Sequence, residues 1–132
     1  MSGNYWTIFV RKVIEIEFPE ELGVVQFGIQ YDDGYVAFVN GIPVSILELK
    51  NSLTGQTHID GEKQFREDRD PKEPLFRFKR CLVYFAVGNE KASMTTRLSG
   101  RKTRFLPYNK DIENPVNMED HKTSYLWEDI LQ

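Results

Sequence analysis

The alternation of apolar and polar positions predicts a sheet of several strands, with one clear helix in the middle of the chain. Alternation with period two is typical of a strand, whereas apolar spacing of three or four residues is typical of a helix. Strands are predicted at residues 13–18, 24–30, 35–40, 44–51, 81–87, 91–98 and 103–107. Helices are predicted at residues 58–68 and at residues 124–131, the second with Ser124 as its N-cap.

Turn signals divide these elements and set the fold class. Gly and Pro between residues 40 and 44 join two strands into a hairpin whose second arm is 44–51. The continuous apolar run 81–87 is typical of a strand at the centre of a sheet. Strands, a helix and then a buried strand predict an α+β (or α/β) fold, with a central mixed β-sheet flanked by helices.

Composition limits the chain to one globular domain. The 132 residues are 40% hydrophobic and carry a formal net charge of -3, which argues mildly against a protein that coats nucleic acid. The single cysteine, Cys81, excludes a disulfide within the chain and favours a reducing, cytoplasmic location. Cys81 as a nucleophile is one interpretation, and a small buried core residue is the more frequent case. No stretch is long enough to span a membrane.

The stretch Glu48-Leu49-Lys50 carries the candidate chemistry. In a strand, Glu48 and Lys50 point to the same face, and two opposite charges on a mostly buried strand are costly unless they are paired or functional. A carboxylate could hold Mg²⁺ while the Lys stabilises charge near a scissile phosphate. An edge strand with a solvated salt bridge is the plainer interpretation of these residues alone.

Several stretches together resemble a known family, the N-terminal nuclease domain of the R (HsdR) subunit of type I restriction-modification enzymes. They read Phe-Val-Asn-Gly-Ile-Pro at 38–43, Glu-Leu-Lys-Asn at 48–51 and Leu-Thr-Gly-Gln-Thr at 53–57. Further stretches lie at residues 66–76, 85–87, 94–98, 103–107 and 123–128. The resemblance runs from about residue 36 to the end of the chain, and the combination is more specific than any one piece.

The resemblance implies a restriction-endonuclease-like PD-(D/E)xK core and Mg²⁺-dependent cleavage of double-stranded DNA. It further implies that residues 1–132 are one nuclease domain of a longer R subunit, whose ATP-driven translocase would follow. Methylation and specificity subunits would be its partners and select the DNA site. The chain holds no Gly-x-x-x-x-Gly-Lys-Ser/Thr sequence, so ATP binding is not assigned to it.

Position by position, the resemblance implies catalytic roles for Glu48, Lys50 and Gln64. Glu48 would be a metal ligand, Lys50 would stabilise the transition state, and Gln64 would lie beside the metal. The family's other metal-ligating Asp falls here on Gly34. Asp33 is therefore the expected second metal ligand, with Asp32 as an alternative, provided that a bulge or turn brings one of them to the face of Glu48.

Other reactive side chains have plain interpretations. His58 and His121 are the only histidines, and either could serve a metal or act as a base, but their polar surroundings favour solvated surface positions. The basic cluster at residues 77–80 could contact phosphate, and a solvated entry to the next strand is the more frequent case.

Three functions follow from these observations. The first is a metal-dependent DNA endonuclease. The second is a nuclease-like domain that has lost its chemistry and serves as a DNA-binding or subunit-docking module, because Gly34 stands where an Asp is expected. The third is a small α+β interaction domain with an incidental ion pair, which predicts that Glu48 and Lys50 are exposed to solvent.

Overall fold

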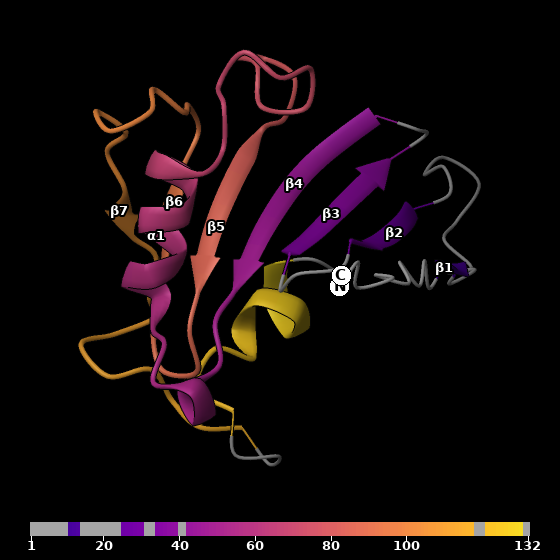
Figure 1. Cartoon of the computed structure of the whole chain (residues 1–132). Coiled ribbons are helices and arrows are strands. Elements are labelled where there is room, and N and C mark those ends of the chain that lie inside the picture. The colour runs from indigo at the N-terminus through magenta and orange to yellow at the C-terminus, as the bar shows by residue number, and fades with distance from the viewer. Residues whose placement is uncertain (1–10, 14–24, 31–33, 40–41, 118–120, 131–132) are drawn as a thin grey trace, which may run out of the picture.

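A single mixed sheet organises the chain. The computed structural model describes residues 11–13, 25–30, 34–39, 42–117 and 121–130. Within these residues seven strands follow one another across the sheet in sequence order, and only β4 and β5 are parallel neighbours (Figure 1). The strands are β1 (Arg11–Val13), β2 (Val25–Gln30), β3 (Gly34–Val39), β4 (Ile42–Leu49), β5 (Val83–Val87), β6 (Ala92–Thr95) and β7 (Leu106–Pro107). The predicted α+β class with a mixed sheet is confirmed.

The predicted hairpin is formed by β3 and β4, which are antiparallel neighbours in the sheet. Gly34 lies opposite Glu48 at one end of the pair, and Val39 lies opposite Ile42 at the other. The register shifts between Ala37 and Phe38, which marks a β-bulge. The hairpin therefore carries Glu48 at the carboxyl end of β4, next to the beginning of β3.

The helix α1 (His58–Glu67) makes the connection between β4 and its parallel neighbour β5. Its first turn is closed by a capping box: the Thr57 hydroxyl accepts a hydrogen bond from the Ile59 amide, and the Asp60 carboxylate accepts one from the Thr57 amide. Figure 1 shows α1 lying beside β5 and β6. The helix predicted at residues 58–68 is thus confirmed to within one residue.

Two apolar clusters occupy the two faces of the sheet, as the alternation along β4 and β5 requires. The cluster under α1 is built around Phe65, Ile46 and Tyr84. The opposite cluster contains Leu47 and Phe85, and it is completed by residues of the C-terminal segment. That segment includes η2 (Leu126–Ile130), drawn in yellow near the carboxyl end of β4 in Figure 1.

Boundaries differ from the sequence prediction in the second half of the chain. The strand predicted at 91–98 ends at Thr95, and the one predicted at 103–107 is reduced to β7. Between them the Thr103 hydroxyl donates a hydrogen bond of 2.6 Å to the Gly100 carbonyl and accepts one from the Ser99 amide, so this segment turns instead of extending.

Two further differences concern the ends. The helix predicted at 124–131 is a single π-helical turn, η2, whose Leu126 is pulled into the core. The Ser124 carbonyl accepts hydrogen bonds from the amides of Trp127 and Glu128 at the start of this turn. Of the strand predicted at 13–18, residues 14–18 lie outside the described residues.

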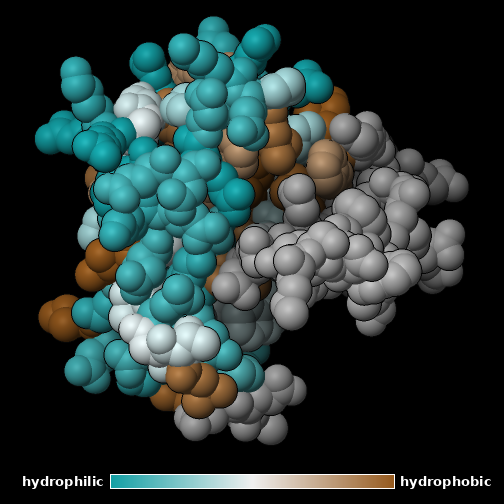
Figure 2. Space-filling model, in the orientation of Figure 1, coloured by the Kyte–Doolittle hydropathy of each residue, from teal (hydrophilic) through white to brown (hydrophobic). Residues whose placement is uncertain are grey.

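The outward side of α1 is hydrophilic, and Figure 2 shows hydrophilic residues spread across this part of the surface. Its exposed positions include Asp60, Lys63 and Glu67. None of the described helices combines the length and the apolar character that crossing a membrane requires.

Candidate active site

Glu48 and Lys50 lie side by side beneath α1, on the same side of the sheet. The Glu48 residue is 1% exposed and the Lys50 residue 7% exposed, so both charged groups are buried. The expectation that this pair is a solvent-exposed, incidental salt bridge is therefore wrong. A buried charge is tolerated only where counter-charges and hydrogen bonds replace the lost water, which makes the partners of these two side chains informative.

Four side chains form one connected polar group. The Lys50 ammonium donates a hydrogen bond of 2.5 Å to Gln64 Oε1 and lies 3.4 Å from Glu48 Oε1. The other carboxylate oxygen, Glu48 Oε2, accepts a hydrogen bond of 3.1 Å from the Arg69 guanidinium. Both oxygens of Glu48 are thus paired with a cation, and the Arg69 pair is the shorter of the two.

A close approach between α1 and the sheet brings Gln64 to Lys50. A Cβ built on Gly61 would lie 3.1 Å from Ala86 Cβ and 3.5 Å from the Glu48 carbonyl oxygen. Gly61 therefore lets the helix settle on β4 and β5 at the level of Glu48. Gln64, one turn further along the helix, then faces the same pair of strands and reaches the ammonium.

Arg69 was not anticipated from the sequence. The amides of Asp68 and Arg69 both donate to the Gln64 carbonyl, at 2.9 and 3.2 Å, so α1 ends here and Arg69 follows its last turn. A buried Glu48 requires a counter-charge, which is the one signal that could have suggested a basic residue near the end of the helix. Arg66 satisfies the same sequence criterion, and only the tertiary structure selects Arg69.

The second carboxylate expected at this site is not among the described side chains. Gly34, the position that the resemblance aligns with a metal-ligating Asp, lies directly opposite Glu48 in the β3–β4 pair. Directly opposed residues of an antiparallel pair project to the same face, so a side chain at position 34 would stand beside Glu48. Asp32 and Asp33 lie outside the described residues, and the assignment of Asp33 as a metal ligand stays a prediction.

The described donor set does not by itself complete a site for a divalent cation. Across the part of the chain that the structure describes, no three His, Cys, Asp or Glu side chains come together as potential ligands. The one carboxylate, Glu48, already holds the cations of Lys50 and Arg69 on its two oxygens. Mg²⁺ would need a further oxygen donor and a free oxygen on Glu48.

The cysteine and the histidines lie apart from this chemistry. Cys81 is 3% exposed, its thiol lies 3.3 Å from the Val83 carbonyl, and burial raises the pKa of the thiol, all of which confirm a core residue. His121 is exposed and packs edge-on against Trp127, with ring centroids 5.9 Å apart. His58 is half-buried at the beginning of α1.

The basic cluster at residues 77–80 is exposed, as expected of a solvated entry to the next strand. Phe78 contacts two cations: Lys79 Nζ is 5.8 Å from its ring centroid, and the Arg97 guanidinium carbon is 5.0 Å from it. Lys79 adopts a positive φ of 70°, typical of a turn. A role in contacting phosphate stays a prediction.

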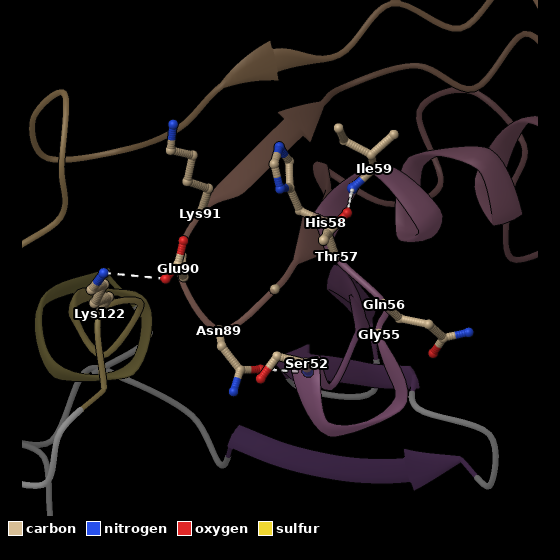
Figure 3. Close-up of a pocket in the computed structure, with 11 residues that line it drawn as sticks. Ser52, Gly55, Gln56, Thr57, His58, Ile59, Asn89, Glu90, Lys91 and Lys122 are labelled. Carbon is tan, nitrogen blue, oxygen red and sulfur yellow. Dashed lines mark hydrogen bonds and ion pairs between the residues drawn. The ribbon is translucent and has the colours of Figure 1, made fainter.

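A cavity of about 690 Å³ opens at the carboxyl ends of β4 and β5 (Figure 3), and Glu48 is not among the described residues that line it. It is lined by residues of 52–59 and 88–91 and by Lys122. The Lys122 ammonium lies 3.2 Å from a Glu90 carboxylate oxygen, so two of the three charged side chains that line this cavity, which include Lys91, pair with each other. This arrangement assigns no chemistry to the cavity.

Comparison with known proteins identifies the family of the chain. A family model described as the type I restriction enzyme R protein N terminus matches residues 26–103, more than half of the 132-residue chain. The matched range includes Glu48, Lys50, Gln64 and Arg69. Neither a curated protein nor a solved structure matches the chain. The mixed sheet and the sequence resemblance agree with this match. The chain therefore belongs to the family of the type I restriction enzyme R protein N terminus.

Proposed function

We propose that the chain is a DNA endonuclease domain that hydrolyses phosphodiester bonds of double-stranded DNA, with its centre at Glu48 and Lys50. The observation that carries the proposal is the burial of these two side chains 3.4 Å apart at the carboxyl end of β4. Their position within the matched range supports it. Double-stranded DNA and the methylation and specificity subunits of a restriction complex are the proposed partners, and the chain would be one domain of a longer R subunit.

Lys50 and Gln64 have distinct proposed roles. Lys50 carries a positive charge to the site, where it would stabilise the negative charge that develops on a phosphate during cleavage. Gln64 accepts a hydrogen bond from the ammonium at 2.5 Å and so holds it in one orientation. A fixed ammonium in a water-poor site stabilises such charge more than a mobile, hydrated one.

Mg²⁺ is the proposed cofactor, with Glu48 and Asp33 as its proposed ligands. When bound, the ion would supply Lewis-acid stabilisation of a phosphate oxygen and a more nucleophilic water. A carboxylate oxygen suits this hard cation, and Glu48 is the described group that could provide one.

The test is nicking of supercoiled plasmid DNA with Mg²⁺ or Mn²⁺, by the chain alone and within the assembled R subunit complex. Glu48→Gln and Lys50→Ala are the diagnostic variants, and Lys63→Ala, an exposed position of α1, is the control. We expect the wild type and Lys63→Ala to nick the plasmid. The nicking rate of Glu48→Gln and of Lys50→Ala should fall at least about a hundredfold, which is the usual effect of removing one group that stabilises the transition state. Equal nicking rates for all four proteins would contradict the proposal.

A second candidate function is a domain without chemistry that binds DNA or docks other subunits. The observation that favours it is Gly34 opposite Glu48, together with a carboxylate neutralised by two cations. This candidate predicts that DNA binding, measured by fluorescence anisotropy, is the same for the wild type and Glu48→Gln, and that neither protein nicks plasmid. Glu48-dependent nicking would exclude it.

A further inference from the structure

Positive charge is concentrated in the second half of the chain. Residues 77–104 contain eight Lys and Arg residues and one acidic residue, Glu90, although the whole chain has a formal net charge of -3. Six of these cations lie in the connections that precede β5 and follow β6. They are all exposed, and we call them the basic surface: Lys79, Arg80, Arg97, Arg101, Lys102 and Arg104.

The fold brings the two connections to the same end of the sheet. β5 and β6 are antiparallel, with Tyr84 opposite Thr95, so the segment before β5 and the segment after β6 lie at one end of this pair (Figure 1). The Arg97 guanidinium carbon lies 5.0 Å from the centroid of the Phe78 ring, and Lys79 Nζ lies 5.8 Å from it. Cations that are far apart in the sequence therefore form one surface.

Hydrogen bonds fix the backbone of both connections. The Arg80 amide donates to the Arg77 carbonyl at 2.9 Å, and the Thr103 hydroxyl donates to the Gly100 carbonyl at 2.6 Å. Arg66 Nε donates to the Thr103 carbonyl at 3.0 Å, which holds this turn against α1. A ligand would meet a surface whose backbone is already ordered, and this lowers the entropic cost of binding.

In the part of the chain that the structure describes, none of the six cations of the basic surface forms an ion pair with a carboxylate. At the end of α1, by contrast, Arg66 is paired with Glu62 and Arg69 with Glu48. Like charges that are gathered without partners repel one another and raise the local positive potential. The basic surface is therefore suited to a ligand that carries several negative charges in a row.

We propose that the basic surface binds the phosphate backbone of double-stranded DNA. A duplex carries one negative charge per about 1.7 Å of its axis, so one short stretch can neutralise several of these cations. Arg66 contacts the turn at Thr103 and Arg69 contacts Glu48, so the end of α1 connects the basic surface with the Glu48 site. The inference rests on the proposed function, because it takes duplex DNA as the polyanion, but it requires neither cleavage nor a metal ion.

The experiment is a titration of the full 132-residue chain into a short, fluorescently labelled DNA duplex, followed by anisotropy, with a chelator present and at several salt concentrations. Arg101→Gln/Lys102→Gln removes two charges of the basic surface whose side chains hold no other described residue. Lys63→Gln/Lys91→Gln is the matched control, because both lysines are exposed, lie outside the basic surface and carry the same total charge.

The diagnostic variant should bind the duplex at least about tenfold more weakly at low salt. The slope of log affinity against log salt concentration should become shallower by about two, since each lost phosphate contact releases about one counterion fewer. The control should keep the affinity and the slope of the wild type. Two duplexes of unrelated sequence should bind equally well, because phosphate contacts carry no sequence information.

A second diagnostic variant tests the other connection. Lys79→Gln/Arg80→Gln removes two charges before β5 and should weaken binding as the first variant does, if the two connections form one surface. Circular dichroism and the thermal midpoint check that each variant is folded.

Three results would overturn the proposal. The first is wild-type affinity and salt slope in both diagnostic variants. The second is an equal loss in the control, which would make the effect one of net charge alone. The third is failure of the wild-type chain to bind the duplex at low salt. Equal affinity for polyglutamate would overturn the choice of DNA and indicate an acidic protein as the partner.

The basic surface and the proposed function can fail separately. Glu48→Gln should bind the duplex as the wild type does, because Glu48 is not part of the basic surface. Nicking that depends on Glu48, with binding unchanged in the basic-surface variants, would overturn the surface and leave the endonuclease. Binding that is lost in those variants, with no nicking by any protein, would leave the surface and overturn the endonuclease.

Discussion

Gly34 and Glu48 are direct partners across the β3–β4 hairpin. Residues paired in this way have Cβ positions about 4.5–5.5 Å apart and share one face of the sheet. The backbone therefore offers a second position beside the buried carboxylate, and the sequence places a residue without a side chain there. This relationship explains why the described residues contain one acidic group at the site.

Restoring a carboxylate at this position tests the geometry. Gly34→Asp should lower the thermal midpoint in the presence of a chelator, because it places a second carboxylate in a mostly buried setting where Lys50 and Arg69 are already paired with Glu48. Mn²⁺ or Mg²⁺ should then raise the midpoint more in this variant than in wild type, since a cation that binds the added carboxylate supplies the missing partner. Gly34→Asn, with a similar volume and no charge, is the control, and an equal response of Asp and Asn variants to the cation would contradict the prediction.

Gln64 is expected to orient the Lys50 ammonium. Gln64→Ala removes its closest partner and leaves a buried ammonium with an unmade hydrogen bond, at a cost of about 1 to 3 kcal/mol in the free energy of unfolding. Urea unfolding of Gln64→Ala and of the neighbouring exposed control Lys63→Ala measures the difference. A loss no greater than in the control would show that the contact does not hold the ammonium. Plasmid nicking should fall in Gln64→Ala and stay unchanged in Lys63→Ala.

Gly61 sets the distance between α1 and the sheet. The γ-methyls of Gly61→Val would enter a space where even a Cβ lies 3.1 Å from Ala86 Cβ. Overpacking of this kind costs about 1 to 3 kcal/mol in the free energy of unfolding, and displacement of the helix would carry Gln64 away from Lys50. Lys63→Val introduces the same β-branched residue on the exposed side of α1. Similar unfolding curves for the two variants would argue against the close approach.

Tyr84 is the residue whose ionisation should matter in alkaline solution. Burial, and secondly the nearby Cys81 thiol, raise the pKa of its hydroxyl to about 12, from an ordinary value of 10.0. The folded state thus favours the neutral phenol, so its contribution to stability is complete below pH 10 and is lost as the pH rises toward 12. Tyr84→Phe should remove this alkaline loss.

Near neutral pH the same substitution should be mild. The Tyr84 hydroxyl is buried and has no hydrogen-bond partner among the described residues, so Tyr84→Phe should change the free energy of unfolding by less than about 1 kcal/mol. Thermal unfolding measured at neutral and at alkaline pH checks both statements. A large loss at neutral pH, or equal alkaline loss in the two proteins, would contradict them.

Local patterns predicted the elements that have strong local signals. Alternation and a turn of Gly and Pro predicted the β3–β4 hairpin, and a continuous apolar run predicted β5. The helix α1 was predicted from a narrow apolar stripe, and the Pro-rich segment at 70–74 agrees with its end at Glu67. Boundaries after β6 were less accurate, because a hydrogen bond from a side chain, such as that of Thr103, ends an extended segment without changing the apolar pattern.

In the candidate active site, too, some features could be predicted from the sequence and others could not. Glu48 and Lys50 could be placed on one face because the period of a strand is two residues, and the resemblance singled out Gln64. Neither source indicated that Glu48 would lie against Arg69, since the pairing depends on how α1 ends and how closely Gly61 lets it approach the sheet.

The amino-acid sequence by itself determined the family, the class of fold and the shared face on which Glu48 and Lys50 lie, because these depend on residue identity and on short periods along the chain. Tertiary structure alone decided which cation neutralises Glu48, how deeply the pair is buried and that position 34 stands beside it. Those properties depend on contacts between residues 14 to 21 positions apart, and no local pattern encodes the packing that brings them together.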